Sequence, residues 1–381
     1  MSDLAIKSAS DAVLEPKIGS LEIQQFRALR QLKIEGLGRV NLITGRNNTG
    51  KSSILEALRI LASNASISVV LQILRSREEV NDDDGASGLE HANEFPLSGL
   101  FHGFPEFPGD LKPIVIAARG ANSPMLMSIS AEEFVEEEES DGTTRLIPYQ
   151  QDLIEQHERV SALVIESGEV RRLIRLENLV RLSPRRFEFA EVLFPCVFVT
   201  PYGGERTATL GRLWDKIALT DREGDVVDAL RIIDTKISAV SMVGGEGPRR
   251  LRTAIVRSDG IPRPIPLRSY GDGLNRLFGI ILSLVNAQGG LLLIDEFENG
   301  LHYTVQTDVW RAIFRLASAL DVQVVATSHS RDAVEAFQKA ASEVPDRGVL
   351  VKLSRAGDRI VPTVFSEQEL AIITRDQIEV R

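Results

Sequence analysis

The chain has a single cysteine, Cys196, among its 381 residues. One cysteine excludes a disulfide framework within the chain and any cysteine-rich zinc site, and it is typical of a reducing compartment. Long apolar runs are missing too, because the longest, such as Leu277–Val285, fall far short of the roughly 20 residues of a membrane-spanning helix. The segment Met1–Lys17 is polar and mixed, unlike a secretion signal. We therefore expect a cytoplasmic protein without a membrane partner.

Net positive charge and repeats are also lacking. The formal net charge is −10, so the surface as a whole does not resemble that of a DNA-binding protein. Seven acids gather in Glu132–Asp141, where we expect a solvated loop or helix face; the alternative is a nucleic-acid mimic or a partner-binding tail. No internal repeat is present, and the strand-rich middle lacks sustained heptads. The apolar content of 43% fits one large α/β domain with an insertion, or two domains.

A glycine-rich loop stands between an apolar run and a helical pattern. Gly45–Ser52 reads GRNNTGKS, which matches G-x-x-x-x-G-K-[ST]. The glycines allow successive backbone N–H groups to cradle phosphates, Lys51 adds a cation for the β- and γ-phosphates, and the Ser52 hydroxyl is a ligand for Mg²⁺. The loop therefore predicts a nucleoside triphosphate site. The residues expected to contact ATP are Gly45, Arg46, Asn47, Asn48, Thr49, Gly50, Lys51, Ser52 and Ser53.

Two acids end an apolar strand pattern in the second half. Leu291–Glu296 reads LLLIDE, and ligands of a parallel sheet bind beyond the carboxyl ends of its strands. Asp295 is therefore expected to hold Mg²⁺, directly or through water, and Glu296 to orient and deprotonate the attacking water. The alternative is a polar strand end that caps the next turn.

Two further segments are typical of nucleotide sites. His329, in Thr327–Ser330, follows another buried strand pattern, and we expect it beside the two acids, in reach of the γ-phosphate; the alternative is an ordinary loop histidine. The segment SYGDG places Ser269 and Gly271 before a strongly apolar helix, which predicts a second anion site. Because the phosphate loop already serves this chain's own nucleotide, a second subunit would supply that anion.

The order GRNNTGKS, SYGDG, LLLIDE, ENGLH and ATSHS resembles the ABC-type ATPase heads of the RecF, SMC and OLD-like group. It is most similar to the stand-alone bacterial OLD-like predicted ATPases. The resemblance covers roughly residues 18–75 and 205–365. It implies that Gly45–Ser52 is the Walker A loop, Asp295 and Glu296 the Walker B pair and His329 the switch histidine. Ser269 and Gly271 stand in the ABC signature, and Asn299–His302 in the D-loop.

The implied fold class is α/β: a P-loop NTPase with a mainly parallel core sheet, an antiparallel β lobe and a mixed insertion. We expect a first ATPase lobe at 18–80, a strand-rich insertion or β lobe at 81–205 and a second ATPase lobe at 206–381. Tyr270 replaces the usual first signature glycine, and no Q-loop glutamine is evident. Only 52 residues follow His329, too few for the TOPRIM nuclease domain of OLD proteins.

The resemblance implies a homodimer of heads that sandwiches two ATP molecules and hydrolyses them. The expected role is a switch in DNA repair or anti-phage defence, with a separate nuclease or other effector. A group of arginines is the candidate DNA contact, although a solvated strand face explains it as well: Arg171, Arg172, Arg175, Arg181, Arg185 and Arg186. The alternatives are the nucleotide-binding subunit of a transporter and a nucleotide-gated scaffold that does not hydrolyse ATP.

Overall fold

The computed structural model describes residues 16–79, 97–109, 111–120, 124–138, 144–149, 159–181, 191–201, 207–232, 234–244, 252–344, 348–365 and 369. Its first elements are β1 (Ser20–Phe26), β2 (Leu29–Glu35), β3 (Val40–Gly45), α1 (Lys51–Ala62), α2 (Ile67–Ser76), η2 (Ser98–Leu100), β4 (Ile114–Arg119), β5 (Met125–Glu138), β6 (Thr144–Pro148), β7 (Arg159–Ser167), β8 (Val170–Arg175) and α3 (Leu176–Arg181).

The later elements include most of the core. They are β9 (Cys196–Val199), α4 (Thr207–Asp215), α5 (Arg222–Arg231), β10 (Ile237–Gly244), β11 (Arg252–Ser258), β12 (Ile265–Pro266), α6 (Leu267–Tyr270), α7 (Asp272–Asn286), β13 (Leu291–Ile294), α8 (Tyr303–Ala319), β14 (Gln323–Ser328), α9 (Arg331–Ala341), β15 (Gly348–Ala356) and β16 (Arg359–Phe365). Within the described ranges, no helix is long and apolar enough to cross a bilayer.

The core sheet has the strand order β16-β15-β3-β14-β13-β9. Of the five pairings in this sheet, β15 with β16 is antiparallel and the other four are parallel. The mainly parallel core sheet predicted from the sequence is therefore confirmed. The phosphate loop connects β3 to α1 at the carboxyl edge of this sheet, and β13 and β14 end at the same edge.

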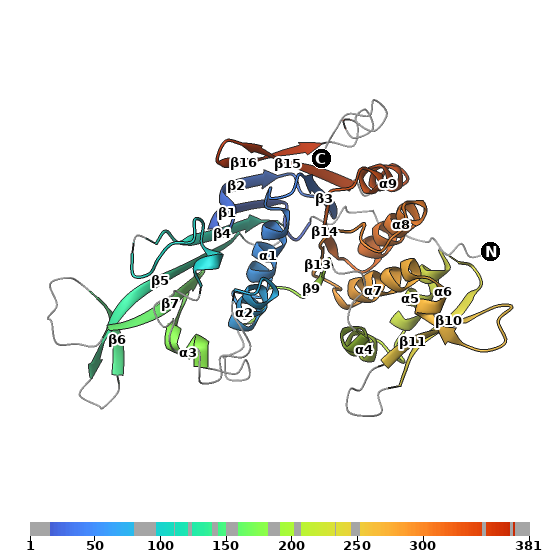
Figure 1. Ribbon diagram of the computed structural model, residues 1–381, viewed down its shortest axis with the longest axis horizontal. Helices are drawn as coiled ribbons and strands as arrows, with labels where there is room; N and C mark the ends of the chain where they lie inside the picture. The colour runs from blue at the N-terminus through green and yellow to red at the C-terminus, as the bar shows by residue number, and fades with distance from the viewer. Residues whose placement is uncertain are drawn as a thin grey trace, which may run out of the picture.

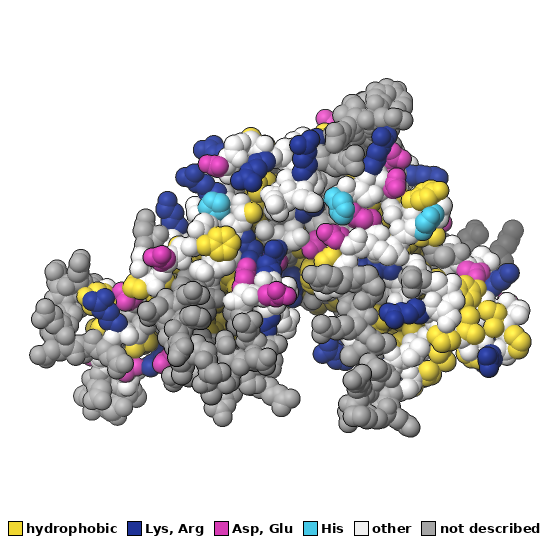
Figure 2. All heavy atoms as spheres, viewed as in Figure 1, with side chains coloured by type: hydrophobic (Ala, Val, Ile, Leu, Met, Phe, Trp, Pro, Cys, Tyr) yellow, Lys and Arg dark blue, Asp and Glu magenta, His cyan; other side chains and the backbone are white. Residues whose placement is uncertain are grey.

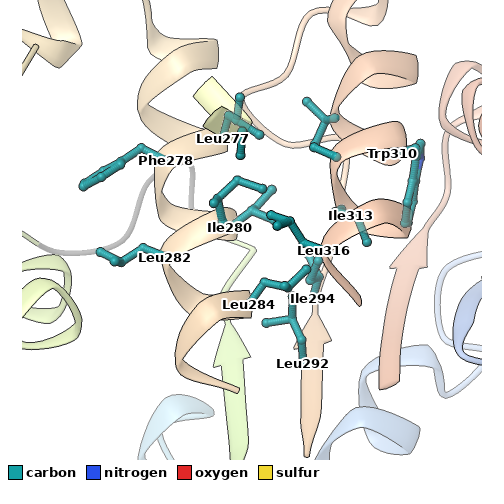
Figure 3. Close-up of a cluster of buried hydrophobic side chains, with 14 of the residues drawn as sticks. Leu277, Phe278, Ile280, Leu282, Leu284, Leu292, Ile294, Trp310, Ile313 and Leu316 are labelled. Atoms are coloured by element: carbon teal, nitrogen blue, oxygen red, sulfur yellow. The ribbon is translucent and has the colours of Figure 1, made fainter. Parts of the chain in front are cut away.

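Alternate side chains of β13 face the two sides of the core sheet. Leu292 and Ile294 pack with the helices α7 and α8, as Figure 3 shows. Leu291 and Leu293 pack instead with the hydrophobic cluster that includes α1, α2 and the antiparallel sheet. A continuous apolar run is what a strand with both faces buried requires, and all four residues are fully buried.

A seven-stranded antiparallel sheet forms the second layer. Its order is β2-β1-β4-β5-β7-β8, and β6 pairs with β5. Helix α1 lies between this sheet and the core sheet, since its apolar residues join the cluster that contains strands of both (Figure 1). A third, three-stranded sheet, β10-β11-β12, lies beside α5 and α6. The predicted antiparallel β lobe is thus confirmed.

The acidic run corrects one expectation. Residues 132–138 belong to β5, so the solvated loop or helix face expected there is wrong for the described part; Asp141 lies outside the described residues. Arg171 of β8 pairs with Glu132 at 3.2 Å, and Arg175 pairs with Glu136. The acidic and basic runs therefore neutralise each other across one sheet, which explains why a strand tolerates so many like charges.

Sheet pairing crosses both expected lobe limits. Strands β1 and β2 precede residue 81 but share a sheet with β4, and β9 precedes residue 206 but pairs with β13. These pairings do not fix where one lobe ends, so the limits 18–80, 81–205 and 206–381 remain predictions. Much of Asn81–Gly109, the start of the expected insertion, lies outside the described residues.

Candidate nucleotide-binding site

The phosphate loop has the backbone that its glycines predict. Gly50 has φ 81°, in the left-handed region, and is the N-cap of α1; Asn48 is left-handed too, at φ 60°. Gly45 has φ 150°, and a Cβ there would lie 2.7 Å from both the Leu353 carbonyl oxygen and Thr49 Oγ1. The loop is therefore closed tightly against β15, and a side chain at Gly45 would push it open.

Lys51 folds back over this loop. Its Nζ donates hydrogen bonds to the carbonyl oxygens of Gly45 at 2.7 Å and Arg46 at 3.0 Å. Partial burial lowers the pKa of Lys51, against the opposing pull of Asp295, Glu298 and Glu296. The ammonium group thus sits at the mouth of the loop and near the carboxylates, where phosphate oxygens would replace the two carbonyls as acceptors.

Asp295 joins three elements of the core. Its Oδ1 accepts hydrogen bonds from Ser52 Oγ at 3.2 Å and from Thr327 Oγ1 at 2.6 Å. Ser52 begins α1, Asp295 follows β13, and Thr327 lies in β14, so parallel strands bring the three together at one edge, as predicted. Asp295 is only 7% exposed.

A tight turn directs the residues after Asp295. Glu296 has φ 48°, an unusual left-handed value for a glutamate, and its N–H donates to Thr327 Oγ1 at 2.9 Å. Phe297 is fully buried and stacks on Trp310, with ring centroids 4.0 Å apart. Asn299 Nδ2 donates to Glu296 Oε2 at 2.5 Å and to the Pro201 carbonyl at 2.9 Å. The buried aromatic pair and these bonds hold the Glu296 carboxylate in place.

His329 meets a carboxylate that the sequence reasoning missed. Glu298 Oε1 accepts a hydrogen bond from the His329 backbone N–H at 2.9 Å and lies 3.0 Å from His329 Nδ1. The Glu298 side chain is 10% exposed, whereas that of His329 is 48% exposed. Figure 2 shows acidic side chains and a histidine close together on the face above β13 and β14.

Ser269 and Gly271 belong to other elements than the residues of this cluster. Ser269 is exposed near the end of α6, and Gly271, with φ 142°, is the N-cap of the 15-residue helix α7. Among the described residues, no hydrogen bond joins either of them to the phosphate loop. Tyr270, the departure from the usual signature, donates to Asp234, and this bond raises the pKa of Tyr270.

The residues present fit a Mg²⁺ ion and a nucleotide. Ser52 Oγ and Asp295 Oδ1 offer two oxygen ligands at one point, and Mg²⁺ is usually held by one or two carboxylates, with phosphates and water completing its shell. Residues 46–48 of the loop are exposed to solvent, and successive N–H groups of such a loop bind anions. A cleft of about 450 Å³ adjoins the loop and is lined by residues 46–49 and 352–355.

Two family models match the chain. One is described as "AAA ATPase domain" and matches residues 17–149, and the other, "AAA domain, putative AbiEii toxin, Type IV TA system", matches residues 202–334. Both segments are therefore similar to AAA-type ATPase domains. The first match contains the phosphate loop, and the second contains Asp295, Glu296 and His329. This confirms the predicted ATPase class, while the OLD-like assignment remains a prediction.

Individual relatives are more distant or shorter. An ATP/GTP phosphatase of Helicobacter pylori is 25% identical over 351 residues, 86% of this chain and 89% of that protein. An uncharacterised protein of Methanocaldococcus jannaschii is 48% identical over 59 residues, 15% of this chain; the match spans only 27% of that relative's length.

Solved SMC head domains align along most of the chain. One from Thermotoga maritima is 13% identical with a TM-score of 0.43, covering 92% of this chain and 99% of that one. One derived from Pyrococcus furiosus, bound to the C-terminal domain of ScpA, is 11% identical with a TM-score of 0.46, covering 96% of this chain and 100% of that one.

Sequence reasoning missed three residues of the site: Thr327, Glu298 and Asn299 as hydrogen-bonding partners. All three lie within the motifs ENGLH and ATSHS, but motif spacing does not show which side chains meet across two strands. Their contacts depend on the left-handed backbone conformation of Glu296, which the local sequence pattern does not predict.

Proposed function

We propose that this chain is a Mg²⁺-dependent ATPase that works as a dimeric switch in DNA transactions or anti-phage defence, with a separate effector. The observation that carries the proposal is the contact of Ser52 and Asp295 at 3.2 Å, with Glu296 next to them. A metal-binding hydroxyl, an acidic metal ligand and a second carboxylate at the phosphate loop are the parts that phosphoryl transfer to water requires.

Each residue of the cluster has a role in this proposal. The loop N–H groups and Lys51 bind the phosphates, and Ser52 and Asp295 hold Mg²⁺, which supplies charge neutralisation when bound. Thr327 fixes the Asp295 carboxylate, and Glu296, held by Asn299, orients the attacking water and accepts its proton. His329 donates to the γ-phosphate and senses its loss.

Dimerisation is proposed because the second predicted anion site, at Ser269 and Gly271, needs an anion from another chain. Ser269 and Gly271 are exposed or partly exposed and make no hydrogen bond to the phosphate loop within the described residues. Two chains facing each other would place these residues of one against the nucleotide of the other. ATP would then close the pair, and hydrolysis would reopen it.

The setting is proposed from the family descriptions. One matched model is described with a putative toxin of a type IV TA system, which supports an ATPase that works with an effector. The name of the Helicobacter pylori relative, an ATP/GTP phosphatase, supports hydrolysis. We place the protein in the cytoplasm and keep DNA as a possible partner.

DNA contact, if it occurs, is expected away from the arginines of β8. Arg171 and Arg175 are paired with glutamates, and Arg172 donates to the Asn64 carbonyl. The side chains of Arg181, Arg185 and Arg186 lie outside the described residues. Replacing Arg171 and Arg172 by glutamate should leave DNA binding unchanged, as measured by fluorescence anisotropy.

Two measurements on one set of variants test the proposal. Wild-type protein should release phosphate from Mg-ATP, Glu296→Gln should bind ATP without releasing phosphate, and Lys51→Ala should lose ATP affinity. Light scattering should then show an ATP-dependent doubling of the Glu296→Gln mass that Ser269→Arg abolishes. Equal phosphate release by wild type and Glu296→Gln would refute the role of Glu296, and absence of release by wild type would refute the ATPase role. An unchanged mass with ATP bound would refute the dimeric switch.

A further inference from the structure

The contacts of the described fold do not explain why the Glu298 carboxylate is buried. One oxygen accepts from His329, while Oε2 is buried and has no hydrogen-bond partner within the described part of the chain. Burying a carboxylate with one oxygen unpaired costs stability unless the charge serves another purpose. The group lies in the nucleotide site, where its charge also acts on Lys51.

The backbone around Glu298 is held so that this carboxylate stays at the site. Its neighbour Phe297 is anchored by the Trp310 stack, and its own carbonyl accepts from the Leu301 N–H at 3.0 Å. His329 is fixed less firmly, because it follows the end of β14 and its side chain is half exposed. The rigid partner of the pair is therefore Glu298.

We propose that Glu298 is the positioning residue of His329 and specifies which ring nitrogen meets the nucleotide. This inference rests on the proposed ATPase function. Nδ1 lies 3.0 Å from Glu298 Oε1, and because a carboxylate only accepts, this contact is favourable when Nδ1 carries a proton. Nε2 is then the nitrogen left for a ligand, and the hydrogen bond from the His329 backbone N–H to the same oxygen holds the residue beside Glu298. The arrangement follows the general pattern in which the partner of one histidine nitrogen sets the role of the other.

Kinetics separate positioning from a merely structural contact. We expect Glu298→Ala and His329→Ala each to lower kcat for ATP about tenfold or more, with little change in KM, because the phosphate loop still binds the substrate. The double variant should be no slower than His329→Ala alone, since Glu298 acts through that ring. Glu298→Gln, which retains an acceptor oxygen, should recover part of kcat. Glu335→Gln, on the exposed face of α9, is the matched carboxylate control.

A spectroscopic readout does not depend on hydrolysis. The chain has five histidines, so ¹⁵N-histidine spectra of the full-length protein are simple, and His329→Gln identifies the His329 signals. At pH 8 we expect His329 to be the Nδ1–H tautomer, and Glu298→Ala to abolish that preference. Thermal melting shows whether Glu298→Ala folds; if it does not, Glu298→Gln replaces it in the cycle.

The outcomes distinguish the two proposals. An Nε2–H ring in wild type, or effects of Glu298→Ala and His329→Ala that multiply in the double variant, would overturn the positioning role while leaving the ATPase intact. Absence of wild-type hydrolysis would overturn the ATPase proposal, and the tautomer spectra would still decide whether Glu298 holds the ring.

Discussion

The buried ion cluster beneath the β1–β2 turn offers the sharpest test of how the phosphate-loop helix is held. Glu56, on α1, is 6% exposed, and its Oε2 lies 2.5 Å from Arg27 Nε, while Arg77 Nε donates to its other oxygen at 2.8 Å. Burial raises the pKa of Glu56, and the charges of Arg27 and Arg77 oppose that rise. Glu56→Ala would leave the Arg27 guanidinium buried with part of its charge uncompensated.

The size of the effect follows from what Arg27 retains. Breaking a buried ion pair costs about 3–5 kcal/mol, because the remaining charge stays buried. Arg27 keeps two bonds to Glu79, at 2.8 and 3.1 Å, and one to the Gly99 carbonyl. We therefore expect the low end, about 3 kcal/mol. At about 2.1 cal/mol/K of unfolding entropy per residue, a chain of this length would melt about 4 °C lower.

Differential scanning calorimetry of the nucleotide-free protein measures the shift, and Glu35→Ala is the control. Glu35 pairs with Lys33, but both side chains are more than half exposed, so its removal should change the melting temperature by well under 1 °C. A Glu56→Ala variant that melts within 1 °C of wild type would refute the argument, because the cluster would then not hold α1 to the turn.

Three other predictions concern the loop, the thiol and an acid. Gly45→Ala should lower ATP affinity at least tenfold in calorimetry, since its Cβ would meet backbone at 2.7 Å, whereas Gly36→Ala, also left-handed but in open space, should not. Burial raises the pKa of Cys196 to about 12, against the effect of a nearby arginine, so a maleimide at pH 8 should label it about a thousandfold more slowly than an ordinary thiol until the protein unfolds. Burial alone would raise the pKa of Asp321, but the charges and hydrogen bonds of Lys17 and Arg39 outweigh it, so the pKa is lowered. Asp321→Asn should therefore destabilise the fold at pH 7. The difference in stability between this variant and wild type should vanish as acid protonates the wild-type carboxylate.

Local patterns predicted the elements that carry the nucleotide site. The apolar runs at Leu291–Ile294 and Val40–Thr44 became strands of the core sheet, and the helical spacing after Ser52 became α1. These elements have continuous apolar runs or regular spacing bounded by glycine or acids, and such signals survive in any tertiary context. The motif residues met at one sheet edge because parallel strands leave no other arrangement.

Other features depend on contacts that the sequence does not encode locally. Strand β9 has only four residues and was not predicted, because it is a strand through its pairing with β13. The acidic run, expected as a solvated loop or helix face, forms part of a strand whose glutamates pair with Arg171 and Arg175 of β8. The contact between Glu298 and His329 joins residues 31 positions apart. In each case the deciding partner lies on another element, so a window of neighbouring residues cannot reveal it.

The position of β3 in the core sheet also sets the order of events during synthesis. Val40 is paired with Val324 on one side and Gly348 on the other, so the strand that bears the phosphate loop is made early and completed last. At about 5–20 residues per second, a ribosome needs roughly 15–60 s to deliver those neighbours. Throughout that interval the nascent chain exposes an unpaired apolar strand, which makes it a client for chaperones. A chain cut short before β14 would lack both neighbours of β3, together with Thr327 and His329 of the site.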